Sequence, residues 1–308
     1  MSKLPPKHRY YQIAGITVQV ESDLPFSAST FHPKFASFAV DEGGPDTVLL
    51  RHHFEIPDLA SLPAGREIYR HPPWAIRETA SGWTYLGIAA DADDDTIHCV
   101  AQFSADYAVG DIFTPPHTME WWRQGNLSSL TLFPTDQIWL AQLLAHRSAC
   151  YVHSAGVMID DQGLLFVGHS EAGKSTTTQL VRRALPGRAT ILCDDRNIVR
   201  LWPDGAHVHG TWSHGDVPAV SAAGPPLRAI LFLEQARANE LVPLTDRMEA
   251  WQRLLATLVK PLITAAWWQK EMDVLEQIIA TVPCYTMRFD RSGDIVAELQ
   301  ALIAANRP

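Results

Sequence analysis

Gly168-His169-Ser170-Glu171-Ala172-Gly173-Lys174-Ser175, followed by Thr176, is the segment from which the architecture of this chain can be inferred. The eight residues match the phosphate-binding pattern Gly-x-x-x-x-Gly-Lys-Ser, known as Walker A. An apolar run at residues 164–167 precedes them and a helical pattern begins at Lys174, so the segment is expected to join a strand to a helix. The alternative is an ordinary turn that contains Gly and Lys.

Each part of this loop suits a nucleotide. Glycines allow backbone N–H groups to surround a phosphate chain, and the first turn of a helix adds the positive end of its dipole. In this pattern the ammonium group of Lys174 reaches the β- and γ-phosphates, and the hydroxyl of Ser175 binds Mg²⁺. Residues 168–176 therefore predict a site for ATP and Mg²⁺.

Two adjacent carboxylates follow the next apolar run, in Ile191-Leu192-Cys193-Asp194-Asp195-Arg196. Phosphoryl transfer uses acidic groups close to the loop, one to hold Mg²⁺ and one to accept the proton of an attacking hydroxyl. We therefore expect Asp194 and Asp195 at the end of a strand beside the loop. Because adjacent carboxylates repel, one of them is expected to have a raised pKa unless Mg²⁺ compensates. An ordinary acidic turn is the alternative.

A histidine lies upstream, in the run Tyr151-Val152-His153-Ser154-Ala155-Gly156-Val157-Met158-Ile159. His153 is expected to begin a strand that leads by a hairpin into the strand before the loop. A histidine among apolar residues is more often a hydrogen-bonded core group than a catalytic one. Taken alone, His153 fits both interpretations.

The whole chain has the composition of a globular protein. Its 308 residues are enough for two domains with substantial cores. The net charge is −9 and the Lys and Arg residues are scattered, which argues against a nucleic-acid partner. No signal-peptide pattern or apolar segment of about 18 residues is present, so we expect a cytoplasmic protein with no membrane partner. The four cysteines are far apart, which predicts buried free thiols.

The two halves of the chain differ in pattern. Short strand-like runs broken by turn residues predict a mostly antiparallel β domain at residues 1–134, which we interpret as an accessory or substrate domain. A helical run at 135–149, capped by Thr135 or Asp136, opens the second domain, 135–308. There strand-like and helical runs alternate, as in an α/β nucleotide-binding fold. Residues 91–95, Asp-Ala-Asp-Asp-Asp, lack the Gly and Glu of a calcium loop and predict a solvated hairpin loop.

The individual elements are expected at the following positions. The strands of the first domain are expected at 13–20, 47–52, 74–78, 83–88 and 97–103. The strands of the second domain are expected at 152–159, 164–167, 189–193, 198–201, 227–234 and 285–289. Its helices are expected from 174 onward and at 245–260, 264–281 and 295–305.

Together, His153, the loop and the Asp pair resemble the catalytic domain of HPr kinase/phosphorylase and the wider group of HPr-kinase-like proteins. In that family a Val-His-Gly or Val-His-Ser-Ala strand, a short hairpin, the phosphate loop and a Leu-x-x-Asp-Asp strand end occur in this order. Here His153 precedes Lys174 by 21 residues, the family's usual spacing. Segments 209–216 and 227–235 look like those of HPr-kinase-like proteins from peptide-modification and uncharacterised clusters, and not like those of HPr kinase proper. The wider group includes kinases of lasso-peptide precursors. The resemblance covers about residues 150–305.

This resemblance implies an α/β P-loop kinase domain like the C-terminal domain of HPr kinase and PEP carboxykinase. It assigns residues 168–176 to ATP, Ser175 and Asp194 to Mg²⁺, and Asp195 to the role of base. Lys174 and His153 would stabilise charge on the transferring phosphoryl group. The family's second metal ligand has no clear counterpart, and Asp216 is the candidate substitute. The family's late catalytic Arg is absent where it is expected, at 220–224.

The main hypothesis is a kinase that moves the γ-phosphoryl group of ATP to a hydroxyl, such as that of Ser, on a peptide or small protein. A small-molecule hydroxyl is the nearest variant, and the resemblance allows a homo-oligomer such as a dimer or ring. A nucleotide switch that hydrolyses ATP is the alternative from another class. Such proteins usually position water with Gln or Glu, whereas this sequence offers a His and an Asp pair. A catalytically inactive binding protein conflicts with the retained Lys174, Ser175 and Asp195.

Overall fold

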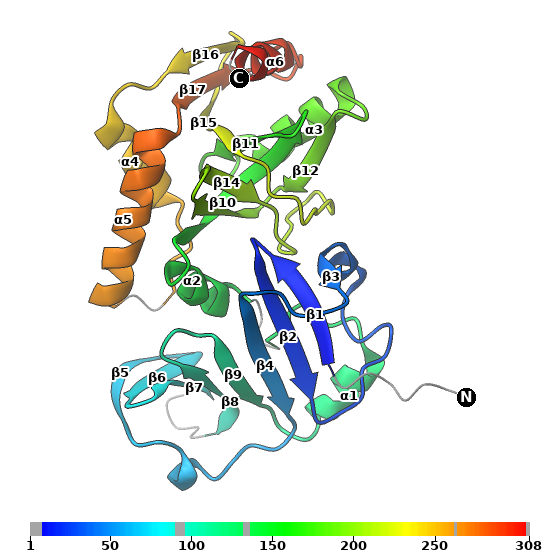
Figure 1. The fold of residues 1–308 in the computed structure, drawn as a ribbon, viewed down its shortest axis with the longest axis vertical. Helices are drawn as coiled ribbons and strands as arrows, with labels where there is room; N and C mark the ends of the chain where they lie inside the picture. Colours follow the sequence, from blue (N-terminus) through cyan, green and yellow to red (C-terminus); the bar gives the residue numbers. More distant parts are fainter. Residues whose placement is uncertain (1–7, 90–95, 132–135, 262–263, 306–308) are drawn as a thin grey trace. The chain divides into compact units, whose positions relative to one another are not determined.

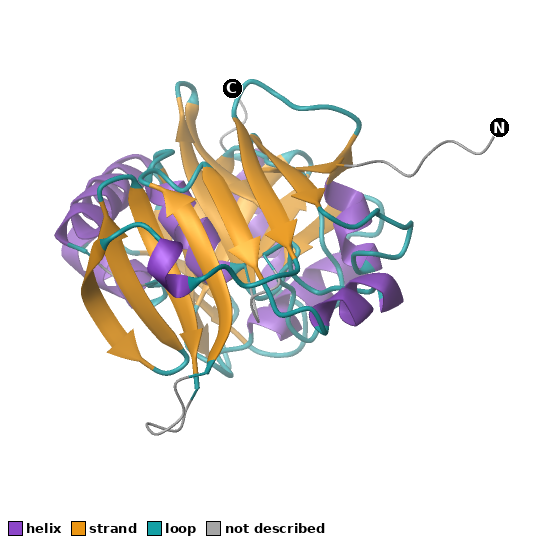
Figure 2. Ribbon diagram, turned by 90° about the horizontal axis from the view of Figure 1, so that it is seen from below, coloured by secondary structure: helices purple, strands orange, loops and turns teal. Residues whose placement is uncertain are grey.

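The computed structural model describes residues 8–89, 96–131, 136–261 and 264–305. The chain divides into two compact units, Met1–Leu143 and Leu144–Pro308, so the division falls after Leu143 and not at the expected residue 134. Pro134, Thr135 and the acidic segment 91–95 lie outside the described residues. The architecture is mixed α/β with two large sheets (Figure 1). Strands make up most of the regular structure, as Figure 2 shows.

The first unit contains a nine-stranded sheet in the order β3-β1-β2-β4-β9-β8-β7-β6-β5. Its neighbouring strands are antiparallel except for the parallel pairs β2–β4 and β4–β9. This agrees with the expected mostly antiparallel domain. The strands are β1 (His8–Ile13), β2 (Ile16–Ser22), β3 (Ala39–Val40), β4 (Thr47–His53), β5 (Gly65–His71), β6 (Trp74–Thr79), β7 (Gly82–Ile88), β8 (Ile97–Ser104) and β9 (Val109–Phe113), with helical segments η1 (Pro33–Phe38), η2 (Leu59–Ser61) and α1 (Thr118–Gln124).

The single strand expected at 13–20 is wrong, because the chain reverses within it. β1 ends at Ile13 and β2 begins at Ile16, with φ values of 48° at Ala14 and 75° at Gly15. Left-handed residues at both positions form a tight two-residue hairpin, in which Ile13 pairs with Ile16. The pattern also predicts neither β5 nor β9 nor α1.

Helix α2 (Gln137–Ala145) is shorter than the expected helix at 135–149. The carboxylate of the buried Asp136 accepts hydrogen bonds from the N–H groups of Leu130 and Thr131, both at 2.9 Å, and from the Thr131 hydroxyl at 2.7 Å. These bonds tie Asp136, the residue directly before the helix, to Leu130 and Thr131. At the other end, Ala149 already belongs to the next strand.

The second unit contains an eight-stranded sheet in the order β14-β13-β10-β11-β15-β17-β16, in which β12 also pairs with β10. Its strands β11, β15 and β17 run parallel to one another. The strands are β10 (Ala149–Ile159), β11 (Gln162–Val167), β12 (Ala189–Cys193), β13 (Arg196–Trp202), β14 (Gly205–His209), β15 (Leu227–Gln235), β16 (Glu240–Pro243) and β17 (Cys284–Phe289). The helices are α3 (Lys174–Ala184), α4 (Arg247–Ala256), α5 (Ala265–Thr281) and α6 (Ile295–Ala304).

Helices cover both faces of this second sheet. Alternate residues of β11 point to opposite sides, so Leu165 and Val167 join a core with α4 and α5, while Leu164 and Phe166 join a core with α3 and α6. A strand buried on both faces reads as a continuous apolar run, which is what residues 164–167 show. Among the described helices, none combines the length and apolar character needed to cross a membrane.

The elements expected in the second unit are present, with ends that differ by a few residues. β12 matches the expected 189–193. The helix expected at 245–260, α4, is shorter at both ends and ends at Ala256. Its start is set at Arg247 because the carboxylate of Asp246 accepts hydrogen bonds from the N–H groups of Met248 and Glu249. The pattern predicts neither β14 nor β16, which are short strands at the two edges of the sheet.

Candidate functional site

The loop 168–175 joins β11 to α3, because β11 ends at Val167 and α3 begins at Lys174. Two of its residues have left-handed backbone conformations, with φ values of 67° at Glu171 and 102° at Gly173. A Cβ atom at position 173 would lie 2.7 Å from the ring of Phe289. Conformation and space therefore both require glycine at this position.

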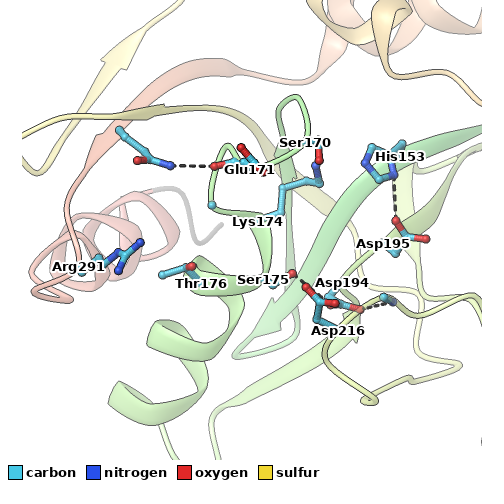
Figure 3. A pocket seen from close by; sticks show the side chains of 13 residues that line it. His153, Ser170, Glu171, Lys174, Ser175, Thr176, Asp194, Asp195, Asp216 and Arg291 are labelled. Atoms are coloured by element: carbon cyan, nitrogen blue, oxygen red, sulfur yellow. Dashed lines mark hydrogen bonds and ion pairs between the residues drawn. The ribbon is translucent and has the colours of Figure 1, made fainter.

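Lys174 is buried at the loop, with 8% of its surface exposed. Its Nζ donates hydrogen bonds to the carbonyl oxygens of Gly168, at 2.8 Å, and His169, at 3.0 Å. Burial lowers the pKa of Lys174, and the negative charges of Asp195 and Asp194 oppose this effect. The ammonium group is thus held at the loop, in a cavity that it shares with both carboxylates (Figure 3).

The Asp pair lies in the break between two strands, β12 and β13, that pair one after the other with β10. β12 ends at Cys193 and β13 begins at Arg196, and both strands pair antiparallel with β10. Within the break, the N–H of Ser154 in β10 donates to the carbonyl oxygen of Asp195 at 3.0 Å. The break places the two carboxylates in different surroundings.

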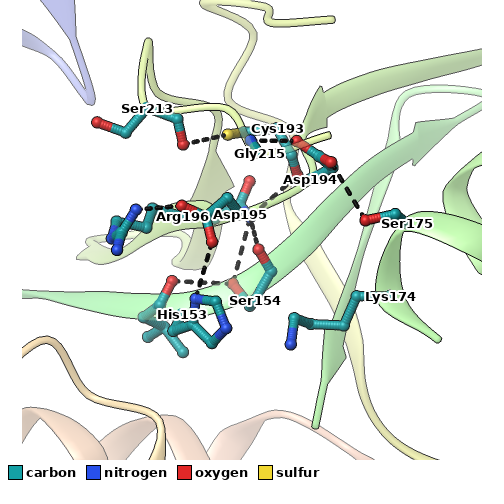
Figure 4. A network of polar contacts seen from close by, with 12 residues as sticks. His153, Ser154, Lys174, Ser175, Cys193, Asp194, Asp195, Arg196, Ser213 and Gly215 are labelled. Atoms are coloured by element: carbon teal, nitrogen blue, oxygen red, sulfur yellow. Dashed lines mark hydrogen bonds and ion pairs between the residues drawn. The ribbon is translucent and has the colours of Figure 1, made fainter. Parts of the chain in front are cut away.

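Asp194 connects α3 with the segment that follows β14. Its buried carboxylate accepts hydrogen bonds from the N–H groups of Gly215 and Val217, both at 2.8 Å. The hydroxyl of Ser175, in the first turn of α3, donates to the same carboxylate at 3.3 Å (Figure 4). Asp194 is therefore held in place by groups from both sides of the cavity.

Asp195 is paired with two cationic or potentially cationic groups (Figure 4). Nδ1 of His153 lies 3.0 Å from its Oδ1, and the guanidinium group of Arg196 contacts its Oδ2. Burial raises the pKa of Asp195, but the His153 hydrogen bond and the charges of Arg196, His153 and Lys174 outweigh burial, so the pKa is lowered. The expectation that repulsion would raise a carboxyl pKa is wrong for Asp195, because its closest charged neighbours are positive.

His153 lies within β10 and not at its start, because this strand already begins at Ala149. Its side chain is 38% exposed and lines the cavity. The interpretation as a hydrogen-bonded core histidine therefore does not apply.

One cavity of about 690 Å³ brings most of the predicted site residues together. This volume lies within the usual range for small-molecule sites. Gly168, His169 and Ala172 belong to the loop but do not line the cavity. The predicted residues that line it are His153, Ser170, Glu171, Gly173, Lys174, Ser175, Thr176, Asp194, Asp195 and Asp216.

Three further lining residues have no counterpart among the sequence predictions: Gly215, Gln235 and Arg291. Gln235 is the last residue of β15, and Arg291 follows the end of β17. Both strands run parallel to β11 in the sheet. Ligands of such sheets bind beyond the carboxyl ends of the strands. Gln235 and Arg291 could therefore have been proposed as candidate site residues from their positions at or just after the ends of the predicted strands.

The residues of the cavity fit a magnesium ion that arrives with a nucleotide. Mg²⁺ in such sites usually takes one or two protein oxygens, and phosphates and water complete its shell. Ser175 and Asp194 supply a hydroxyl and a carboxylate that lie 3.3 Å apart, and Asp216 lines the same cavity. Within the described ranges, no group of three or more His, Cys, Asp or Glu side chains is arranged to hold a metal ion by itself.

The cysteines are free, as the sequence predicts, although Cys99 is only partly buried. Cys193 precedes the Asp pair, and its Sγ donates to the carbonyl oxygen of Ser213 at 3.2 Å. Burial raises the pKa of its thiol. This raised pKa disfavours the reactive thiolate.

Neither a protein-family model nor a curated protein sequence matches this chain. Among solved structures, the Hpr(Ser) kinase/phosphatase from Coxiella burnetii is similar over 50% of this chain and 88% of its own chain. The sequence identity is 12% and the TM-score is 0.30. A TM-score this low does not define a shared fold, so the geometry of the site carries the functional argument.

Proposed function

We propose that this chain is an ATP-dependent kinase that transfers the γ-phosphoryl group to a hydroxyl, such as that of a serine, on a peptide or small protein. The observation that carries this proposal is the content of a single cavity. It combines a phosphate-binding loop with a carboxylate, Asp195, that is hydrogen-bonded to a histidine, His153. Nucleotide binding alone would require the loop, whereas transfer to a hydroxyl also requires a group that accepts a proton.

The loop residues would hold the triphosphate. Lys174 offers an ammonium group on a side chain that is mostly buried, so its attraction to phosphate is less screened than at an exposed site. Gly173 allows the phosphates to approach the backbone closely, and the N-terminus of α3 adds its dipole. Ser175 and Asp194 would hold Mg²⁺, which neutralises charge on the phosphate oxygens when it is bound.

Asp195 would accept the proton of the attacking hydroxyl. Its lowered pKa keeps the carboxylate ionised at neutral pH, which is the state that a base requires. As the hydroxyl oxygen bonds to the γ-phosphorus, its proton passes to Asp195 and the bond between the γ-phosphoryl group and ADP breaks. Lys174 and His153 would supply positive charge where negative charge develops.

The choice of a peptide acceptor rests on the sequence resemblance to HPr-kinase-like proteins of peptide-modification clusters. A hydroxyl on a small molecule would react by the same chemistry. The acceptor therefore has to be identified by experiment, while the roles of Lys174 and Asp195 are the same for both acceptors.

One observation favours a second function, ATP hydrolysis without an acceptor. Glu171 and Gln235 line the cavity, and ATPases commonly position the attacking water with a Gln or Glu side chain. However, Nε2 of Gln235 donates a hydrogen bond to the carbonyl oxygen of Glu171 at 2.8 Å. This bond occupies the amide nitrogen of Gln235, whereas the Asp195–His153 pair offers a proton acceptor for a hydroxyl, so we rank transfer to a hydroxyl first.

The test is to incubate the purified protein with γ-labelled ATP and Mg²⁺, with and without serine-containing peptides encoded by neighbouring genes. Label on a peptide serine is the expected result, and Lys174→Ala and Asp195→Asn should abolish it. Lys260→Ala is the matched control, because Lys260 is exposed and does not line the cavity. Label released only as inorganic phosphate would favour the ATPase, and unchanged ATP in every mixture would contradict both functions.

A further inference from the structure

Three parallel strands bring their carboxyl ends to the same edge of the second sheet. β11 leads into the phosphate loop, β15 ends at Gln235, and β17 ends at Phe289. Two contacts join these ends. Nε2 of Gln235 donates to the carbonyl oxygen of Glu171 in the loop, and the ring of Phe289 lies against Gly173. The ends of β15 and β17 thus form part of the wall around the loop.

A second hollow of about 250 Å³ lies at these strand ends. It shares Glu171, Gly173, Thr176, Gln235 and Arg291 with the larger cavity and adds Ala236, Phe289 and Asp290. His153, Asp194 and Asp195 do not line it. The hollow therefore extends the site on the side of the loop that is away from the proposed proton acceptor.

The turn that carries Arg291 is held by hydrogen bonds. The carboxylate of Asp290 accepts from Nδ2 of Asn239 at 3.0 Å, and from the N–H and the hydroxyl of Ser292 at 2.8 and 2.6 Å. These bonds lower the pKa of Asp290, that from the Ser292 side chain most strongly. Arg291 thus projects from an anchored turn.

The positions of the charged side chains indicate how a triphosphate would be oriented in the site. Lys174 and Arg291 are the permanently cationic side chains among the residues that line the two hollows. Lys174 shares the larger cavity with the Asp pair, whereas Arg291 and Thr176 also line the smaller hollow (Figure 3). A triphosphate bound along the loop would have its γ-phosphate near Lys174 and Asp195. Its α-phosphate, which is attached to the ribose, would lie near Thr176 and Arg291.

On the basis of the proposed function, we propose that the smaller hollow is the nucleoside half of the site. Arg291 contacts the phosphate that is attached to the ribose, and the base and sugar lie against Ala236 and Phe289. Asp290 offers its carboxylate to a ribose hydroxyl. The hollow takes a nucleoside and not the acceptor, because an acceptor hydroxyl has to lie beside Asp195, which does not line it.

Calorimetric titration with Mg²⁺-ATP, Mg²⁺-ADP and Mg²⁺-tripolyphosphate tests this assignment, because tripolyphosphate has no nucleoside. Ala236→Trp fills the hollow, and we expect it to weaken ATP binding by at least about tenfold and to leave tripolyphosphate binding within about twofold. Arg291→Ala should weaken ATP and ADP binding by a similar factor, about tenfold for a lost charged hydrogen bond. Arg237→Ala is the control, because this exposed neighbour lines neither hollow.

The outcomes separate this inference from the proposed function. If the wild type binds ATP and both Ala236→Trp and Arg291→Ala bind it equally well, the nucleoside does not lie in this hollow. If Ala236→Trp loses tripolyphosphate as well, its effect is not confined to the nucleoside, and the assignment is contradicted. If the wild type binds neither ATP nor tripolyphosphate, the proposed function itself fails.

Discussion

Glu271 allows a prediction whose magnitude follows from its position in α5. Its side chain is buried, and its Oε2 has no hydrogen-bond partner within the part of the chain that the structure describes. Burial raises the pKa of Glu271 from 4.5 to about 8. The fold therefore favours the protonated acid, whereas the unfolded chain ionises at its ordinary pKa.

The sign and size of the effect follow from this difference. A raised carboxyl pKa leaves stability intact below the unfolded pKa of 4.5, reduces it as the pH rises, and reduces it no further above about pH 8. At about 1.4 kcal/mol per pH unit, the wild type should lose roughly 3 kcal/mol between about pH 5 and pH 8 through this group. Glu271→Gln removes the ionisable group at nearly constant shape, so the variant should not show this loss.

Urea unfolding of the wild type and Glu271→Gln at the two pH values measures the difference. Glu276→Gln is the matched control, because Glu276 is exposed on the same helix. The control should follow the wild type. An identical pH dependence in the wild type and Glu271→Gln would contradict the raised pKa, because Glu271 would then have the same pKa in the folded and the unfolded chain.

Three further predictions concern the site. Asp195→Asn should lower the initial rate of phosphoryl transfer by at least about 100-fold under conditions in which urea titration shows the variant to be folded, and near-normal transfer would remove Asp195 as the base. Asp194→Asn should reduce the free energy of unfolding by about 1–3 kcal/mol, because its NH₂ group would face the N–H of Gly215 or Val217; an unchanged urea midpoint would contradict this. Gly173→Val should cost about 1–3 kcal/mol in ATP affinity measured by calorimetry, since φ is 102° there and Phe289 occupies the space; unchanged affinity would show that the loop tolerates another shape.

The sequence was sufficient for those parts of the fold that depend on local pattern. The apolar run 164–167 is buried on both faces, and the loop that follows begins α3 at Lys174. The reversal at Ala14 and Gly15 could not be predicted in the same way, because apolar residues continue across the turn. Only the left-handed backbone at both positions reveals it.

The charged and hydrogen-bonding neighbours of Asp194 and Asp195 also could not be predicted from their adjacency in the sequence. The repulsion expected between Asp194 and Asp195 assumes that each is the other's main neighbour. In the folded chain Asp194 bonds to backbone N–H groups, whereas Asp195 contacts His153 and Arg196. Strand pairing with β10 sets these partners, although His153 lies 42 positions before Asp195 in the sequence.

Arg291 could not be assigned to the site from the sequence. It lies far from the loop in the sequence, in a turn without a recognisable motif, and reaches the site because β17 lies two strands from β11 in the sheet. The order of parallel strands cannot be read from hydrophobic periodicity, since each strand has the same apolar character. Only the topology places Arg291 at the cavity.

In the proposed kinase, residues 168–176 bind the triphosphate of ATP, with Lys174 at its outer phosphates. Calorimetric titration of the wild type, Lys174→Ala and Lys260→Ala with Mg²⁺-ATP measures this binding. We expect saturable binding to the wild type and to Lys260→Ala, and an affinity at least about tenfold weaker in Lys174→Ala. If the wild type bound no nucleotide, or if Lys174→Ala bound it with equal affinity, residues 168–176 would not be a triphosphate site of this kind.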